Sequence, residues 1–120
     1  MIEHTFDAGP VAINYVAEGR EDGRPLVFLH GVSGRWQTWL PVMTAFAAGW
    51  RLYALDFRGH GRSGRAPGAY RAVDDARVAR ARALLADCTF EHFPDVGHGI
   101  HGGQPFAFCQ SVRAFLDALP

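Results

Sequence analysis

Two short apolar runs constrain the fold of this chain more than any other feature. Residues 26–29 and 52–55 lack the alternation of polar and apolar side chains that marks a strand with one face in water. Such runs are typical of strands that helices cover on both faces, as in a parallel sheet. The segment between the two runs is long enough to hold the crossover helix that parallel strands need. The runs therefore predict a layered α/β fold.

The other elements follow from periodicity and turn residues. Residues 2–7 and 11–16 predict a hairpin around Ala8-Gly9-Pro10, and residues 89–93 predict a further strand. Helices are predicted over 39–47, with Pro41 in the first turn, over the Ala- and Arg-rich 73–86, and over 105–119. The apolar faces expected on the first and last helices are Trp36, Trp39, Leu40, Met43, Phe46 and Ala47, and Phe108, Val112, Phe115 and Leu119. Together these elements predict one domain over 1–120, with a three-layer sheet of about five strands (the hairpin plus three crossover strands) and three helices.

Composition excludes several classes of function. The formal net charge of zero gives no electrostatic reason to bind nucleic acid or an anionic membrane. All twelve basic residues are Arg, so Schiff-base chemistry and a Walker phosphate loop are excluded. No apolar run reaches the roughly 18 residues of a membrane helix, and the N-terminus does not resemble a signal peptide. Cys88 and Cys109 are too few for a disulfide framework, so we expect reduced thiols and a cytoplasmic protein. No cofactor is expected.

Three segments carry a family likeness. Residues 26–34, LVFLHGVSG, resemble the third strand and oxyanion loop of the α/β-hydrolases, and residues 56–63, DFRGHGRS, resemble the loop after that family's fourth strand. Residues 93–105, FPDVGHGIHGGQP, are similar to the loop that carries the family's catalytic histidine, followed by its closing helix. The order of the three motifs matches the family order, so the resemblance implies a reduced α/β-hydrolase (esterase/lipase-like) domain.

The resemblance also shows what the chain lacks. In the family, the segment between the second and third motifs holds strands five to seven, a cap, the nucleophile elbow and the acid that orients the histidine. Here only a short stretch separates Ser63 from Gly97, and no G-x-S-x-G occurs. The family's strand order is 1-2-4-3-5-6-7-8. If strands five to seven are removed, we infer that residues 89–93 can dock beside residues 26–29, in the place of the fifth strand. The usual Ser-His-Asp triad cannot be assembled within one such chain.

Four residues are candidates for a residual catalytic site. By the resemblance, His98 is the general base and the backbone N–H of Val32 is an oxyanion donor, although the second donor is lost with the elbow. Ser33 is the hydroxyl nearest to that loop, but a loop or helix-cap role competes with nucleophilic attack. Asp56 follows a strand at the same edge of the sheet, and the family uses its loop structurally.

Other polar residues have competing interpretations. Asp95 serves the turn before Gly97 or orients a histidine, and Cys88 and Cys109 are expected to be small buried hydrophobes. Asp56, His60, His98 and His101 would bind a metal only if their loops converge; His98 and His101 are three residues apart, far from a closed zinc motif, and no metal site is predicted.

These observations predict a weak or promiscuous hydrolase of activated esters, carboxylic or phosphoric, acting on small molecules. The alternatives are a catalytically inactive hydrolase fragment that folds as a dimer and a binding module completed by another chain. A homodimer is expected because the single Ala-rich helix over 73–86 cannot shield one whole face of the sheet, and a swap of that helix between two chains is one route to it.

Overall fold

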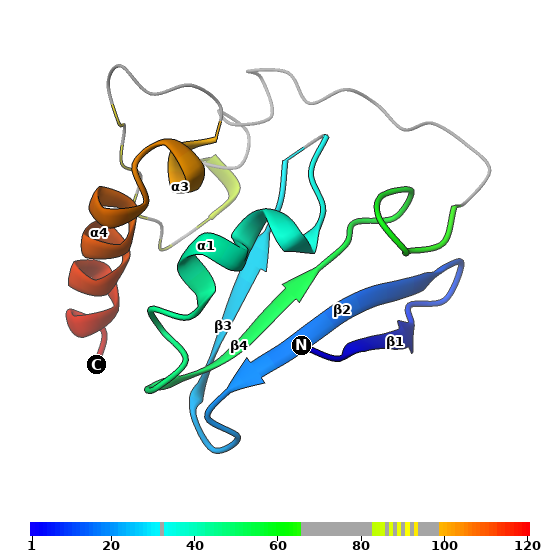
Figure 1. Ribbon diagram of the computed structural model, residues 1–120, viewed down its shortest axis with the longest axis horizontal. Helices are drawn as coiled ribbons and strands as arrows, with labels where there is room; N and C mark the ends of the chain where they lie inside the picture. Colours follow the sequence, from blue (N-terminus) through cyan, green and yellow to red (C-terminus); the bar gives the residue numbers. More distant parts are fainter. Residues whose placement is uncertain are drawn as a thin grey trace.

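The computed structural model describes residues 1–31, 33–65, 83–85, 87, 89, 91, 93 and 99–120. Within them the chain forms a hairpin, β1 (Glu3–Asp7) and β2 (Ala12–Gly19), and then β3 (Arg24–Leu29) and β4 (Trp50–Leu55) (Figure 1). A 3₁₀ turn, η1 (Trp36–Trp39), and α1 (Leu40–Met43) connect β3 to β4. The chain closes with α3 (Ile100–Gly103) and α4 (Pro105–Asp117).

The four strands form one mixed sheet in the order β1-β2-β4-β3. β1 and β2 are antiparallel, β2 and β4 are antiparallel, and β3 runs parallel to β4 with Leu26 opposite Leu52. The reduced α/β-hydrolase arrangement predicted from the sequence is confirmed, including the parallel pairing of the two apolar runs. The fifth strand is not seen in the described part of residues 89–93, because Thr89, Glu91 and Phe93 belong to no strand. The helix predicted over 73–86 falls almost wholly outside the described residues.

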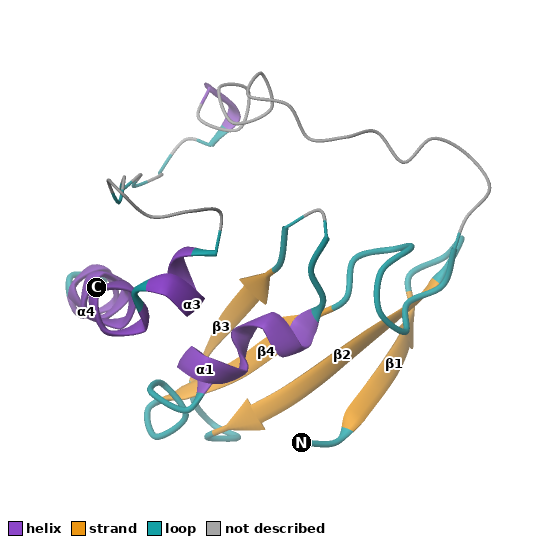
Figure 2. Ribbon diagram, turned by 45° about the horizontal axis from the view of Figure 1, so that its top comes forward, coloured by secondary structure: helices purple, strands orange, loops and turns teal. Residues whose placement is uncertain are grey.

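The core lies on one face of the sheet, beneath α1 and α4. Figure 2 shows α1 lying along the sheet and α4 beyond the β3 edge. Strand residues Val16, Leu52 and Ala54 are fully buried there, and Phe28 is 6% exposed. The residues that cover them from the helical side are Trp36, Val42, Met43, Phe46 and Leu116. Alternation along each strand thus sends one set of apolar side chains into a packed layer.

The first helix is shorter than predicted. Pro41 lies in its first turn as expected, but regular α-helix ends at Met43 instead of Ala47. The backbone N–H groups of Ala45 and Phe46 bond three residues back, to Val42 and Met43, so the chain tightens into turns. The buried face also differs from the predicted one, because Leu40 is 41% exposed while Val42 is fully buried.

The last helix begins at Pro105 as predicted, but its buried face is displaced by one residue. Leu116 is buried whereas Phe115 is 46% exposed. Phe108, Val112 and Leu119 are half-buried against the core, as expected. Positions 108, 112, 115 and 119 follow the 3.6-residue period at least as closely as the set with 116, so the choice of Leu116 over Phe115 is made by where the helix meets the core.

Candidate functional site

The candidate site lies where β3 and β4 end side by side. The loop that follows β3 and the loop of residues 56–65 that follows β4 both leave from this edge of the sheet (Figure 1). Ligands of open α/β sheets bind outside the carboxyl ends of parallel strands, so these two loops are the natural place for chemistry.

Asp56 connects the two loops to the hairpin. Its side chain is 1% exposed. Oδ1 accepts a hydrogen bond of 2.7 Å from the backbone N–H of Trp36, at the end of the β3 loop. Oδ2 accepts bonds of 2.9 Å from Asn14 Nδ2 on β2 and 3.0 Å from the backbone N–H of Arg62. One carboxylate therefore fixes three segments that are far apart in the sequence.

The same contacts determine the charge state of Asp56. Burial raises the pKa of the Asp56 carboxyl, but the backbone N–H groups of Arg62 and Trp36 and the Asn14 amide hold that pKa below its ordinary value. The group is therefore ionised at neutral pH, with both oxygens engaged. This geometry favours the structural role of Asp56 over a part in proton transfer.

His30 is a second connection, and its only mark in the sequence is its place in the LVFLHGVSG motif. It is 4% exposed, and its Nε2 accepts a 2.9 Å hydrogen bond from the backbone N–H of Phe57. Nδ1 lies 2.7 Å from the carbonyl oxygen of Gly31, so Nδ1 carries the proton and donates. His30 thus joins the end of β3 to the end of β4 through its two ring nitrogens. Its position directly after a buried strand was the available signal.

The turn around Gly61 completes the arrangement. Gly61 has φ of +49°, and a Cβ at this position would overlap the Asp56 carboxylate. Ser63 is 7% exposed; its Oγ donates to the carbonyl oxygen of Asp56 at 2.6 Å and accepts from the backbone N–H of Asn14 at 2.9 Å. The Gly and Ser of the DFRGHGRS motif therefore form a compact turn around Asp56, and Ser63 is not placed as a nucleophile.

The four predicted site residues are not all described. Ser33 is exposed in the β3 loop, whose end Asp56 anchors. Val32 and His98 lie outside the described residues, so their approach to Ser33 stays a prediction.

The remaining candidates are scattered. The ring centroid of His60 lies 5.1 Å from that of His30, whereas His101, on α3, stacks on Trp39 at 4.4 Å. No group of three His, Cys, Asp or Glu side chains suited to a metal occurs among the described residues. Asp95 and Cys88 lie outside them.

Cys109 is half-buried on α4, beside the core. Burial raises the pKa of its thiol, which suits an unreactive packed side chain. In the part of the chain that is described, no helix has the length and apolar character needed to cross a bilayer.

Comparison with known proteins identifies the class that this fold and these loops define. The profile of the alpha/beta hydrolase fold matches residues 24–120. The AB hydrolase superfamily protein YfhM of Bacillus subtilis (strain 168) is 28% identical over 114 residues, which cover 91% of this chain and 38% of that protein. The chain belongs to the α/β hydrolase fold family.

Solved structures agree with this assignment. Cfl2 of Burkholderia cenocepacia aligns with a TM-score of 0.54 and 32% identity over 57% of this chain and 23% of its own. The haloalkane dehalogenase DbeA of Bradyrhizobium elkani aligns with a TM-score of 0.56 and 28% identity, over 58% of this chain and 24% of its own. The chain thus spans between about a quarter and two fifths of the length of these relatives.

Proposed function

We propose that the site at the ends of β3 and β4 supports weak hydrolysis of activated esters. Membership of a hydrolase-fold family supports a hydrolytic reaction. The observation that carries the proposal is the pair of hydrogen bonds that fix the two ends of the loop after β3. Asp56 holds the N–H of Trp36, and His30 holds the N–H of Phe57, so the loop that resembles an oxyanion loop keeps defined anchors in a chain without the elbow.

In the proposed reaction, His98 takes a proton from water while the water oxygen bonds to the ester carbonyl carbon. The backbone N–H of Val32 donates to the oxygen that becomes negative, and the alcohol leaves with the proton that His98 returns. An ordered donor lowers the barrier because it need not reorganise as charge develops. Loss of one oxyanion donor removes roughly 3–4 kcal/mol of transition-state stabilisation, so turnover should be slow. An activated leaving group is therefore needed to make it measurable.

The test is turnover of p-nitrophenyl acetate by the purified chain. His98→Ala should lower the rate by about tenfold or more. A general base usually contributes about 10²–10⁴-fold, so a loss at or below the low end of that range is enough to support the role. The matched control is His4→Ala, which removes an exposed imidazole on β1 and reports any non-specific catalysis by histidine. Equal rates for wild type and His98→Ala at neutral pH would overturn the general-base role.

Ser33 requires a separate measurement. If Ser33 attacks the ester, Ser33→Ala should remove an acyl adduct that mass spectrometry detects on the intact protein. If water attacks directly, no adduct forms and Ser33→Ala leaves the rate unchanged.

The second candidate is a hydrolase-fold module without catalytic activity. It is favoured by the absence of G-x-S-x-G from the sequence and by the structural use of Asp56 and Ser63. The same assay separates the two, because an inactive module turns over the ester no faster than buffer does.

A further inference from the structure

Glu3, the first residue of β1, binds the side chains of two residues that Asp56 already holds by their backbone. Its Oε2 accepts a hydrogen bond of 3.0 Å from the Arg62 guanidinium, and its Oε1 accepts one of 3.2 Å from the indole N–H of Trp36. The backbone N–H groups of the same two residues donate to Asp56. Two carboxylates, Glu3 and Asp56, therefore join Trp36 to Arg62 by separate sets of bonds.

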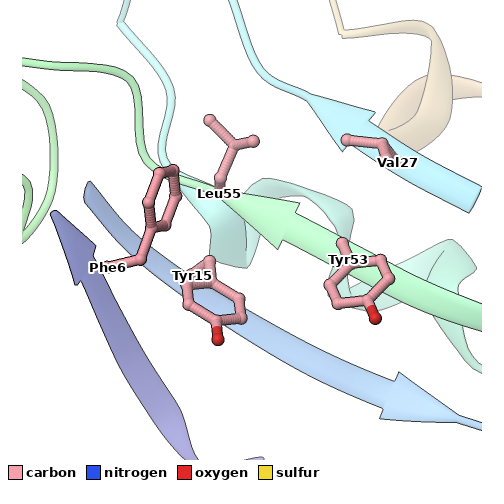
Figure 3. Close-up of a pocket in the computed structure, with 5 residues that line it drawn as sticks. All are labelled: Phe6, Tyr15, Val27, Tyr53 and Leu55. Atoms are coloured by element: carbon pink, nitrogen blue, oxygen red, sulfur yellow. The ribbon is translucent and has the colours of Figure 1, made fainter. Parts of the chain in front are cut away.

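Glu3 reaches these loops from the far edge of the sheet. β1 and β3 are the two edge strands of the described sheet, yet Trp36, at the end of the loop after β3, donates to Glu3 on β1. Phe6, three residues after Glu3, lines a shallow hollow on the face away from α1 (Figure 3). Because side chains alternate along a strand, Glu3 points to the covered face, where it lies opposite the fully buried Val16. The bond to Trp36 thus ties the β3 loop down across the breadth of the sheet.

The two bonds of Glu3 differ in what their loss would cost. Trp36 belongs to the core, so removal of Glu3 would take the acceptor from the N–H of a largely buried indole. The side chain of Arg62 is 77% exposed, and water can replace its carboxylate partner at little cost. The bond to Trp36 is therefore the stronger part of the contact, and the bond to Arg62 adds the second loop to it.

We propose that Glu3 is a positioning residue, which fixes the loop after β3 against the loop after β4 without touching the substrate. Asp56 holds the backbone of Trp36 at one point, and a single point does not set an orientation. Glu3 supplies a second point on the indole. The consequence for the rate rests on the proposed function, because the β3 loop carries the expected donor Val32. An oxyanion donor accelerates a reaction when it is held in place before charge develops.

The first experiment measures the two loops without any substrate. In two-dimensional NMR of the full chain, Glu3→Ala should move the Trp36 indole proton upfield, because that proton loses its acceptor. The backbone amides of Trp36 and Arg62 should exchange with solvent about threefold to tenfold faster, since local opening then breaks fewer bonds. Glu3→Gln keeps an oxygen for the indole but no charge for Arg62, so it should restore most of the Trp36 signal.

The matched control is Asp22→Ala. It removes a carboxylate from Arg20 in the exposed turn between β2 and β3, so it makes the same chemical change away from the two loops. The Trp36 indole proton and the exchange of the Trp36 and Arg62 amides should stay as in wild type.

The second experiment measures turnover of p-nitrophenyl acetate by variants whose far-UV circular dichroism matches that of wild type. Glu3→Ala should lower kcat by about threefold or more and change KM by less than about twofold, because an oxyanion donor acts in the transition state more than on the bound ester. Glu3→Gln should recover most of kcat. Trp36→Phe removes the indole N–H, so in that background Glu3→Ala should have little further effect.

Three outcomes would overturn the positioning role. They are an unchanged indole proton and amide exchange in Glu3→Ala, an equal loss of kcat from Glu3→Ala with and without the Trp36 indole, and a Glu3→Gln variant as slow as Glu3→Ala. If Trp36→Phe does not fold, the comparison of Gln with Ala at position 3 takes its place. A wild type that turns over no ester would overturn the proposed function alone, because the indole proton and the amide exchange still decide whether Glu3 fixes the two loops.

Discussion

The two faces of the sheet differ in cover far more than in composition. On the covered face, Val16, Leu52 and Ala54 are fully buried beneath α1 and the core side chains around it. On the opposite face, called the open face below, Val27 and Leu29 of β3 are about half exposed although they belong to an equally apolar strand. The comparison teaches that an apolar strand sequence specifies a need for cover, while the connecting segments decide which face receives it.

The largest effect is expected in the covered layer. Leu52→Ala should lower the free energy of unfolding by about 3–5 kcal/mol, because Leu52 is fully buried and truncation leaves a cavity. Urea denaturation measures this change, and it should not depend on protein concentration. A loss below about 1 kcal/mol would mean that this layer is loosely packed and that the contrast between the faces is weak.

The buried carboxylate at the edge of the covered layer should be nearly as sensitive. Asp56→Asn should cost about 2–3 kcal/mol, because a neutral amide cannot accept from Trp36, Arg62 and Asn14 together.

The pH dependence of stability tests the same group. Because the pKa of Asp56 is lowered on folding, its contribution is present above its unfolded pKa of about 3.9 and is lost as pH falls through the folded value. Wild type should therefore lose stability in acid more steeply than Asp56→Asn. The measurement is the free energy of unfolding of both proteins as a function of pH. An equal loss of stability in acid for wild type and Asp56→Asn would contradict this account.

Gly61→Ala should cost about 2 kcal/mol. The backbone there is left-handed, and the added methyl group meets the Asp56 carboxylate. Gly49→Ala is the matched control, since a Cβ there meets nothing within 4 Å. Thermal unfolding of the two variants should separate them clearly, and equal melting temperatures would show that the turn can shift away from Asp56.

The smallest effect is expected on the open face. Val27→Ala should change the free energy of unfolding by less than about 0.5 kcal/mol, because the side chain is about half exposed. Urea denaturation of the variant and wild type measures this difference. A large loss would show that Val27 is well packed, which would remove the contrast between the faces.

Local sequence patterns were sufficient for the four strands that the structure describes. The runs at 26–29 and 52–55 predicted two parallel strands, and β3 and β4 extend those runs by two residues at their N-terminal ends. The expectation of cover on both faces was wrong for β3, whose Val27 and Leu29 are about half exposed. Pro41 and Pro105 marked helix starts correctly, because proline fits a first turn where no N–H bond is needed. These signals are local, so they can be interpreted without knowing which other segments pack against the strand or helix.

Helix faces and the site needed the tertiary structure. The choice of Val42 over Leu40 and of Leu116 over Phe115 depends on where each helix meets the sheet. The roles of Asp56 and His30 depend on N–H groups of Trp36 and Phe57 that arrive from other segments. The two motifs predicted that Asp56 and His30 lie at this edge of the sheet, but they did not show which atoms these side chains bind.

The sequence by itself determined that this chain builds a parallel strand pair of the hydrolase type and that it lacks a nucleophile elbow, because both are written in consecutive residues. Only the tertiary structure decided that Asp56 serves as an anchor and that one face of β3 is left open. The physical reason is that burial and hydrogen bonding are properties of pairs of segments. A strand cannot encode which of its faces will be covered when both are equally apolar.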